Sequence, residues 1–345
     1  MIRALVVDDS ATARAAVTAI LTRDVGVAVV GEARDGVEAV ELATRLRPDI
    51  VTMDIFMPRL NGLEATKEIM IEAPCPILLV TGGLDPSESA LTMQALESGA
   101  VCVLAKPPSP GSPAYERHAI QLVETVKAMA GVKVVHHRRT AAHGARLAAR
   151  KAAPRVIAIA ASTGGPAALA RLVADLPADF PTPLLVVQHM TPGFTTSFAG
   201  WLRSASALAI RVAEAGESLM PGTLYLAPEG RHLQVARGPK AVLSGGLPVA
   251  GFRPSGSVLF DSVAEVYGAA ATAVVLTGMG EDGIAGLRTL RRAGGCVLAQ
   301  DRESCVVFGM PAAAIAAGLV DEVVSRGALG GRLRALTGNG HGGRQ

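Results

Sequence analysis

Short β-branched segments alternate with helical patterns through the first part of the chain, and this alternation limits the folds open to it. Five strand-like runs occupy residues 3–9, 27–33, 49–54, 76–82 and 100–106. Five helical patterns lie between and after them, at residues 11–23, 36–46, 62–70, 88–98 and 114–129. Regular strand–helix alternation predicts a parallel sheet with helices on both faces. We therefore expect a doubly wound α/β domain.

A second α/β pattern begins at Arg155. Strand-like runs that end in loops cover residues 155–162, 183–190 and 271–280, with further candidates at 295–301 and 318–324. Residues 223–246 alternate in the manner of β-strands around Gly/Pro turns, which predicts an antiparallel hairpin insert. The chain has 345 residues, more than one hydrophobic core usually spans. We expect a second doubly wound, Rossmann-like sheet that carries the hairpin.

The segment between the two patterns is basic. Its charged residues are Lys133, Arg138, Arg139, Arg146, Arg150 and Lys151, and it contains no acidic residue. Because it lacks a large apolar face, we expect a tether, although a basic stretch can also contact nucleic acid or anionic lipid. We place the first domain at residues 1–130, the linker at 131–153, the second domain at 154–336 and a disordered tail at 337–345.

Composition narrows the class of protein. A net charge of +3 is too small to predict a nucleic-acid binder by itself. The four cysteines form no CxxC pair, which fits free thiols in a reducing compartment. The N-terminus lacks a secretory pattern, and no apolar run is long and charge-free enough to span a bilayer. We expect a cytoplasmic protein with no nucleic-acid partner and no membrane insertion.

Polar residues end the predicted strands of the first domain: Asp8 and Asp9 the first, Asp54 the third, Thr81 the fourth and Lys106 the fifth. Parallel strands bring their carboxyl ends to one edge, so we expect these side chains to meet. Three carboxylates there would repel each other unless a hard cation such as Mg²⁺ lay among them. A carboxylate beside Mg²⁺ can attack a phosphoryl donor, and an ammonium and a hydroxyl can hold the phosphoryl oxygens.

Ser162, His189 and Asp282 are the candidate reactive residues of the second domain, each at the end of a predicted strand. A hydroxyl becomes a nucleophile when an imidazole takes its proton and a carboxylate orients that imidazole. The other histidines lie on a helix, in the tether, in the hairpin or in the tail: His118, His136, His137, His143, His232 and His341. His189 is therefore the candidate base.

Local roles remain open for the same residues. Asp8 can cap a helix, and Asp54 can fasten a turn. Ser162 can open a phosphate-binding turn, since free amides at a helix start attract anions. Asp282 can cap the helix that follows it. "STGGP" lacks the G-x-G-x-x-G spacing, the P-loop lysine is missing, and there is no G-x-S-x-G elbow.

Residues 1 to about 130 resemble the receiver domain of two-component response regulators, through "VVDDS", "DIVTMDIFMPRLNGLEA", the Thr81 position and "LAKP". The resemblance implies a flavodoxin-like fold and phosphorylation by a cognate sensor histidine kinase. The implied roles are phospho-acceptor for Asp54, Mg²⁺ ligands for Asp8, Asp9, Asp54 and Phe56 through its carbonyl, and switch partners for Thr81 and Lys106. Val103 stands where receivers commonly carry an aromatic residue, so the usual aromatic switch rotamer is absent.

Residues 154–336 resemble the catalytic domain of the CheB family of receptor protein-glutamate methylesterases. The matching motifs are "AASTGGPAAL", "VVQHMTPGFTTSFAGWL", "LTGMGEDG" and "RPSGSVLFDS". Ser257 stands where family members often carry an acidic residue. The implied roles are nucleophile for Ser162, general base for His189, orienting carboxylate for Asp282, oxyanion donor for the Met279 amide, pocket formation for Thr163, Gly164 and Gly165, and substrate contact for Arg253 and Ser255.

The two resemblances together imply a phosphorylation-regulated esterase. Its substrates would be glutamate methyl esters on the cytoplasmic helices of methyl-accepting chemoreceptors, which it would convert to glutamate and methanol without a cofactor for the ester step. Deamidation of receptor glutamines is implied by the same pocket. In the unphosphorylated state, the receiver would pack near the catalytic edge and impede access. The alternative is a phospho-controlled regulator whose second domain only binds a partner.

Overall fold

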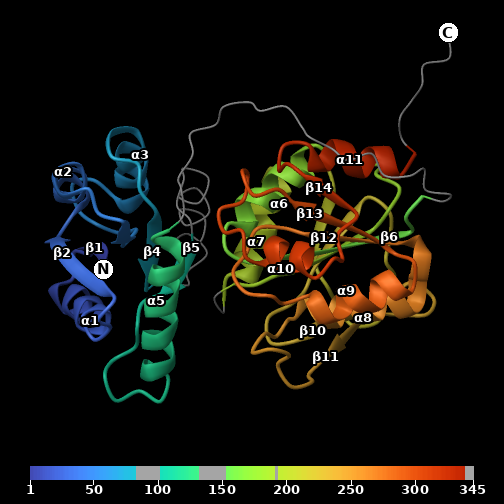
Figure 1. The fold of residues 1–345 in the computed structure, drawn as a ribbon, viewed down its shortest axis with the longest axis horizontal. Coiled ribbons are helices and arrows are strands. Elements are labelled where there is room, and N and C mark those ends of the chain that lie inside the picture. Colours follow the sequence, from blue (N-terminus) through green and yellow to red (C-terminus); the bar gives the residue numbers. More distant parts are fainter. Residues whose placement is uncertain (83–101, 132–152, 191–192, 339–345) are drawn as a thin grey trace, which may run out of the picture. The chain divides into compact units, whose positions relative to one another are not determined.

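The chain divides into two compact units, Met1–His137 and Arg138–Gln345 (Figure 1). The computed structural model describes residues 1–82, 102–131, 153–190 and 193–338. The helix expected at 88–98 lies outside the described residues, as do nearly all of the basic linker and residues 339–345 of the tail. The bounds given above for domains, linker and tail remain predictions.

The first unit contains a five-stranded parallel sheet in the order β2-β1-β3-β4-β5. Its strands are β1 (Ile2–Val7), β2 (Val27–Ala33), β3 (Ile50–Met53), β4 (Ile77–Thr81) and β5 (Cys102–Ala105). Its described helices are α1 (Ala11–Leu21), α2 (Gly36–Leu46), α3 (Gly62–Glu72) and α5 (Tyr115–Met129). All five expected strands form, and their order is that of flavodoxin-like folds, so the predicted fold class is confirmed.

Side chains that cap the helices determine where α1, α2 and α3 begin in the first unit. The Ser10 side chain caps α1, Asp35 caps α2, and Asn61 forms a reciprocal capping box with Glu64 at the start of α3. Gly62 is needed for a steric reason: a Cβ at this position would lie 2.0 Å from the carbonyl oxygen of Asp54. The absence of that Cβ lets α3 begin directly against the residue that ends β3.

The second unit contains a seven-stranded, wholly parallel sheet in the order β14-β13-β12-β6-β7-β9-β8. The strands are β6 (Val156–Ala161), β7 (Leu184–Gln188), β8 (Ala209–Val212), β9 (Thr223–Leu226), β12 (Ala271–Val275), β13 (Cys296–Gln300) and β14 (Glu322–Val324). The helices are α6 (Gly165–Ala174), α7 (Thr195–Ser204), α8 (Gly256–Tyr267), α9 (Ile284–Arg292), α10 (Met310–Ala316) and α11 (Leu329–Leu336), with a 3₁₀ turn η1 (Gly268–Ala270).

An antiparallel hairpin, β10 (His232–Ala236) and β11 (Lys240–Ser244), is present but shorter than the sequence pattern predicted. Residues 223–226, expected within it, form β9 and pair in parallel with β7 and β8. All four residues of β9 are buried, so this strand has no solvent face of the kind a hairpin edge shows. The short strand β8 was not anticipated.

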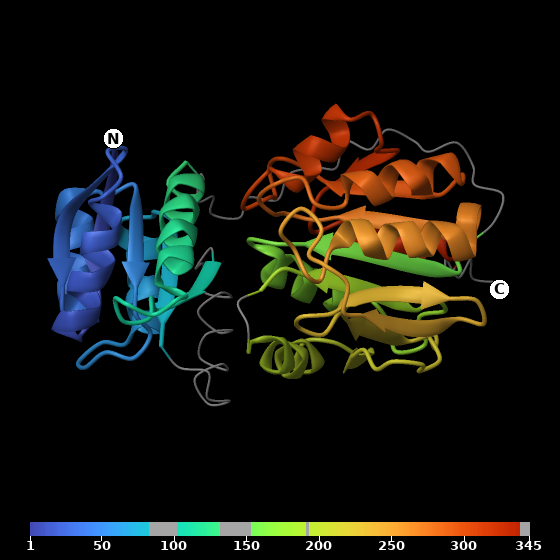
Figure 2. The ribbon, with the colours of Figure 1, turned by 90° about the horizontal axis from the view of Figure 1, so that it is seen from below.

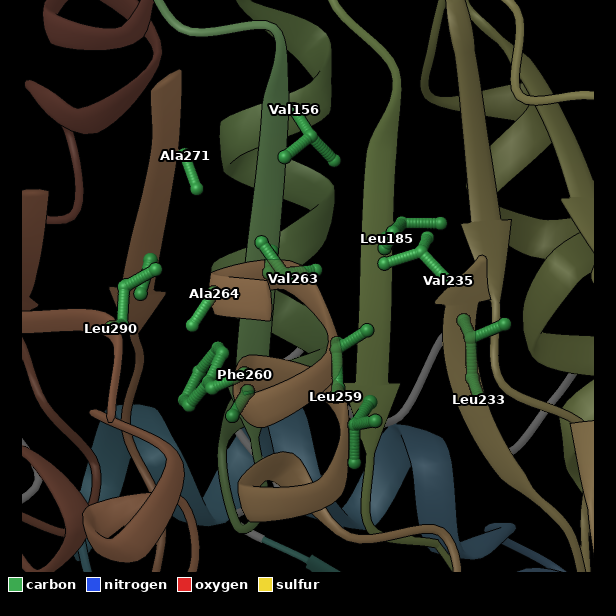
Figure 3. Packing of buried hydrophobic residues seen from close by; sticks show 14 of the residues in the cluster. Val156, Leu185, Leu233, Val235, Leu259, Phe260, Val263, Ala264, Ala271 and Leu290 are labelled. Carbon is green, nitrogen blue, oxygen red and sulfur yellow. The ribbon is translucent and has the colours of Figure 1, made fainter. Parts of the chain in front are cut away.

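Both faces of the second sheet are covered by helices (Figure 2). On one face, α8 packs across β6 and β12, where Phe260 and Val263 belong to the same buried cluster as Val156 and Leu185 (Figure 3). The alternate residues of β6, Ile157 and Ile159, face the other side and are also fully buried. A sheet buried on both faces explains why β6 and β7 read as continuous apolar runs.

Strand order in the second sheet reverses between β6 and β12. Such a switch point opens a crevice at the carboxyl ends of the strands, which is where open α/β sheets bind ligands. The loops that follow β6, β7 and β12 border this crevice. Among the described residues, no helix is both long enough and apolar enough to cross a membrane.

Candidate active site

Ser162 and His189 lie side by side at the edge of the second sheet. Each directly follows its strand, and Ala161 of β6 pairs in register with Gln188 of β7. The main-chain amide of His189 donates to the carbonyl of Ala161 at 2.9 Å, which extends the pairing to the point where the two residues leave the sheet. The two residues therefore leave the ends of neighbouring strands at the same edge of the sheet.

Gln188 ties the two residues to each other. Its side-chain Nε2 donates to the carbonyl oxygens of Ser162 and of His189, both at 2.8 Å. A Cβ on Gly165 would lie 2.1 Å from Oε1 of Gln188, so glycine leaves the room that this amide occupies. Gln188 was not among the residues predicted from the sequence; the available signal was a polar residue in the last position of an otherwise apolar strand.

His189 and Asp282 form a hydrogen-bonded pair. Nε2 of His189 lies 2.9 Å from Oδ2 of Asp282. An ionised carboxylate only accepts hydrogen bonds, so Nε2 carries the proton and Nδ1 of the neutral ring keeps its lone pair. Nδ1 is buried and has no hydrogen-bond partner among the described residues. Among the described residues, Oγ of Ser162 forms no hydrogen bond with Nδ1 of His189.

Four more groups hold the Asp282 carboxylate, all of them hydrogen-bond donors. They are the hydroxyl of Ser255 at 2.6 Å and the amides of Gly256 at 2.5 Å, Ser257 at 3.2 Å and Gly283 at 2.9 Å. Burial alone would raise the pKa of Asp282, but hydrogen bonds from His189 and Ser255 outweigh it and lower the pKa to about 2. The group is therefore an anion at neutral pH.

The starts of α8, α9 and α6 show which helix-capping roles Asp282 and Ser162 have. Asp282 accepts from the first amides of α8, so its charge lies at the positive end of that helix's dipole. The helix that follows Asp282, α9, begins at Gly283 without a side-chain cap. Gly164 begins α6 with a left-handed φ of 75°, again without a side-chain cap. Ser162 is therefore not a helix cap.

The loop after β12 borders Ser162 closely. The amide of Ser162 donates to the carbonyl of Thr277 at 3.1 Å. A Cβ on Gly278 would lie 2.7 Å from Cβ of Ser162, so only glycine permits this approach. Thr277 also donates from its hydroxyl to the carbonyl of Thr163 at 2.9 Å. Within the described residues the amide of Met279 donates no hydrogen bond, which leaves it available to a ligand.

The two residues expected to contact substrate are placed differently from each other. Arg253 is exposed, and its guanidinium donates to the carbonyl of Gly246 at 3.0 Å. Ser255 is fully buried, and its hydroxyl is used by Asp282. The placement of Ser255 fits support of the carboxylate, since no surface of its side chain is open to a substrate.

The edge of the first sheet gathers the predicted acidic cluster. Carboxylate oxygens of Asp8, Asp9 and Asp54 all lie within 4.8 Å of one another. Nζ of Lys106 lies 2.9 Å from Oδ2 of Asp8 and 2.9 Å from Oδ2 of Asp54. Thr81, at the end of β4, has a buried hydroxyl with no partner among the described residues. Oxygen donors at this spacing suit Mg²⁺.

Burial and hydrogen bonding act in opposite directions on the pKa values of Asp54 and Lys106. Burial raises the pKa of Asp54; the hydrogen bond from Lys106 opposes this rise, and repulsion from Asp8 adds to it. Burial would lower the pKa of Lys106, but its hydrogen bonds to Asp54 and Asp8 raise it instead. A bound cation would relieve the repulsion between the two aspartates. Phe56 is 38% exposed, and the role expected of it uses only its main-chain carbonyl.

The sequence of each unit matches a known protein family. The CheB methylesterase family matches residues 157–333, and the response regulator receiver domain matches residues 4–112. A Myxococcus xanthus protein named protein-glutamate methylesterase/protein-glutamine glutaminase 4 is 51% identical over 98% of this chain and 98% of its own length. An Anaeromyxobacter dehalogenans protein of the same name, numbered 3, is 52% identical over 96% of this chain and 98% of its own length.

Among solved structures, the Thermotoga maritima CheB methylesterase catalytic domain is 41% identical and has a TM-score of 0.52. It covers 53% of this chain, and 98% of that structure is matched. An acidic cluster in one α/β unit, a serine, histidine and aspartate site in the other, and the two family matches define a response regulator with a hydrolase output. The chain belongs to the CheB methylesterase family.

Proposed function

We propose that this protein is a protein-glutamate methylesterase and protein-glutamine glutaminase controlled by phosphorylation of its receiver. The hydrogen bond between His189 and Asp282, beside Ser162 at the neighbouring strand end, carries the proposal. An imidazole oriented by a carboxylate, with its other nitrogen buried and unpartnered among the described residues, suits acyl transfer when it lies next to a serine. A domain that only binds a partner has no need of it.

Ester hydrolysis then proceeds in two halves. Nδ1 of His189 takes the proton of Ser162 as Oγ attacks the γ-carbonyl carbon of a methylated glutamate. The imidazolium that forms is stabilised by Asp282, and it returns the proton to the departing methoxide, which leaves as methanol. Water, activated by the same nitrogen, attacks the acyl-enzyme and releases glutamate and Ser162.

The tetrahedral oxyanion requires donors at the mouth of the crevice. The amide of Met279 supplies one, and the turn Thr163–Gly165 shapes the wall around it. A glutamine side chain presents the same carbonyl with an ammonia leaving group in place of methanol. The same residues therefore support deamidation, which the relatives' name states of those proteins.

Control resides in the first unit. Asp8, Asp9 and Asp54 would hold Mg²⁺, with the carbonyl of Phe56, and the cation would neutralise charge on an incoming phosphoryl group. Asp54 accepts the phosphoryl from a sensor histidine kinase. Lys106 and the unpartnered hydroxyl of Thr81 then hold its oxygens. Phosphorylation relieves inhibition by the receiver, which needs only a few kcal/mol of differential stability.

The proposed reaction also indicates where in the cell the enzyme acts. The substrates are helices on the cytoplasmic side of chemoreceptors, so we propose a cytoplasmic enzyme that reaches its substrates without inserting into the membrane.

Incubation with methyl-labelled receptor membranes tests the proposal. Wild-type protein should release labelled methanol, and Ser162→Ala should release none above the rate without enzyme. Methanol release by Ser162→Ala at the wild-type rate would refute the assigned nucleophile. No release by the wild type, with or without a phosphodonor, would instead support the non-catalytic alternative.

A further inference from the structure

The aromatic ring of Phe252 lies flat against the imidazole of His189. The two ring centroids are 4.0 Å apart, and the planes differ by 5°. Phe252 is partly exposed, and it comes from the loop between β11 and α8, far in sequence from β7. Neither the motifs in the sequence nor the reaction described above assigns this residue a role.

The bond to Asp282 fixes only one edge of the imidazole. The χ2 torsion of histidine is an sp³–sp² torsion with a broad energy well, so the ring tilts readily. A hydrogen bond tolerates such a tilt, since its strength falls steeply only at large angles. The direction of the lone pair on Nδ1 follows the tilt directly. A flat partner against the ring face removes this freedom, because tilting would break the stacked contact.

Phe252 is itself held in place by its loop. Its amide and carbonyl exchange two hydrogen bonds with Val249, at 2.9 and 3.0 Å. Leu247 of the same loop is hydrogen-bonded to His232, whose Nε2 lies 3.0 Å from the carbonyl oxygen of Leu247. The imidazole of His232 is 2% exposed, so this anchor is buried in the hairpin.

The anchor of the loop is also connected to Asp282. The amide of Ser255 donates to Nδ1 of His232 at 3.2 Å, and the hydroxyl of Ser255 donates to Asp282 at 2.6 Å. One segment, Gly245–Ser255, therefore contacts both His189 and Asp282. It stacks the ring of Phe252 on His189 and donates the hydroxyl of Ser255 to Asp282. The hairpin insert supplies the buried histidine that joins these two contacts.

We infer that Phe252 is a positioning residue that holds the His189 ring in the plane required for proton transfer from Ser162. The inference rests on the proposed function. The face of the phenyl ring also favours the imidazolium that forms during the reaction, since a cation is attracted to the negative face of an aromatic ring. Both effects act in the transition state and not in substrate binding, so they affect kcat and leave KM unchanged.

Three substitutions test the role. Phe252→Leu keeps apolar bulk but removes the flat ring, and Phe252→Tyr keeps the ring. Tyr267→Leu is the matched control: it makes the same change of aromatic to leucine at the last residue of α8, about 16 Å from the start of that helix by helix rise. Full-length proteins are compared by methanol release from methylated receptor and by the rate at which a fluorophosphonate labels Ser162.

We expect Phe252→Leu to lower kcat and the labelling rate about fivefold, equivalent to about 1 kcal/mol of barrier, with KM within about twofold of wild type. Phe252→Tyr should restore both rates, and Tyr267→Leu should leave them at the wild-type value. Circular dichroism verifies folding, and Phe252→Met provides a second non-aromatic variant should the leucine variant unfold.

Wild-type rates in both non-aromatic variants would overturn the inference, as would a loss in Phe252→Tyr as large as that in Phe252→Leu. A change confined to KM would also overturn it, because it would make Phe252 a substrate contact. These outcomes are separate from failure of the proposed function, which shows as an absence of methanol release by the wild-type protein.

Discussion

Nε2 of His189 lies 2.9 Å from Oδ2 of Asp282, which leaves Nδ1 as the nitrogen available to the serine. In the familiar serine proteases the carboxylate holds Nδ1, and Nε2 takes the serine proton. In the proposed mechanism the imidazole is thus used in the opposite sense. The observed reason is that Nε2, the nitrogen farther from the main chain, reaches Asp282 in the loop after β12.

Asp282→Asn should lower kcat for methanol release by about a thousandfold or more, since the loss of an orienting aspartate permits the wrong tautomer. An amide NH₂ facing Nε2 can only donate, so the proton would move to Nδ1 and block the base. Nitrogen-15 shifts of the His189 ring should report the Nε2–H tautomer in the wild type and its loss in the variant. An unchanged tautomer together with a wild-type rate would contradict the assigned role.

Acid should destabilise the second unit through Asp282. Its pKa is lowered from 3.8 to about 2, so the unfolded chain binds this proton more tightly than the folded one. The contribution, about 2 kcal/mol, is fully present above about pH 4 and is lost as the pH falls through about 2. The single tryptophan, Trp201, lies in α7 and reports unfolding of this unit.

Denaturant titrations followed by Trp201 fluorescence measure this contribution. The difference in free energy of unfolding between the wild type and Asp282→Asn should shrink as the pH is lowered from about 5 to about 2. A difference that stays constant over this range would show that Asp282 is not an anion held by its donors.

Gln188→Met should weaken the site without altering its reactive groups. The substitution keeps the side-chain length but leaves two carbonyls, those of Ser162 and His189, without their shared donor. We expect a loss of about 2 kcal/mol in the free energy of unfolding and a lower kcat. Gln234→Met on β10 is the control, since Gln234 lies in the hairpin and binds neither carbonyl. Equal stability of the two variants would contradict the role given to Gln188.

Gly165→Ala and Gly200→Ala should have opposite effects, although both add one methyl group to a helix. At Gly165 the new Cβ would lie 2.1 Å from Oε1 of Gln188 and 2.9 Å from Cβ of Ala161, so we expect destabilisation by about 1 to 3 kcal/mol. At Gly200, on α7, nothing lies within 4 Å, and alanine should stabilise the helix by about 0.5 to 1 kcal/mol. Thermal unfolding of the two variants checks both signs.

Strand ends explain why much of the site could be anticipated from the sequence. In a parallel sheet the residues that follow neighbouring strands lie at one edge, so the apolar runs indicated that Ser162 and His189, and separately the acidic residues around Asp54, would share an edge. The chemistry of these residues and the family motifs indicated which of them to consider. The same reasoning fails for contacts that depend on loop geometry. Phe252 reaches His189 through such a loop.

Burial explains the other differences between expectation and structure. Ser255 was expected to contact substrate because its motif resembles one in the CheB family; its full burial against Asp282 depends on how α8 packs on the sheet. Residues 223–226 resembled one strand of a hairpin, since alternation in a short strand does not tell which neighbour it will pair with. Tertiary packing against β7 decided that pairing.

Asp54→Asn should abolish activation by a phosphodonor. Lys106 forms ion pairs with both Asp8 and Asp54, and we expect it to keep them until a phosphoryl group on Asp54 binds the lysine. Acetyl phosphate with Mg²⁺ should therefore raise methanol release by the wild type and not by the variant, whose basal rate should not fall. Lys106→Met should still become phosphorylated, as seen by mass, but should show a reduced rise, because the new phosphoryl oxygens lose their cation. Full activation of Asp54→Asn would place the control elsewhere in the molecule.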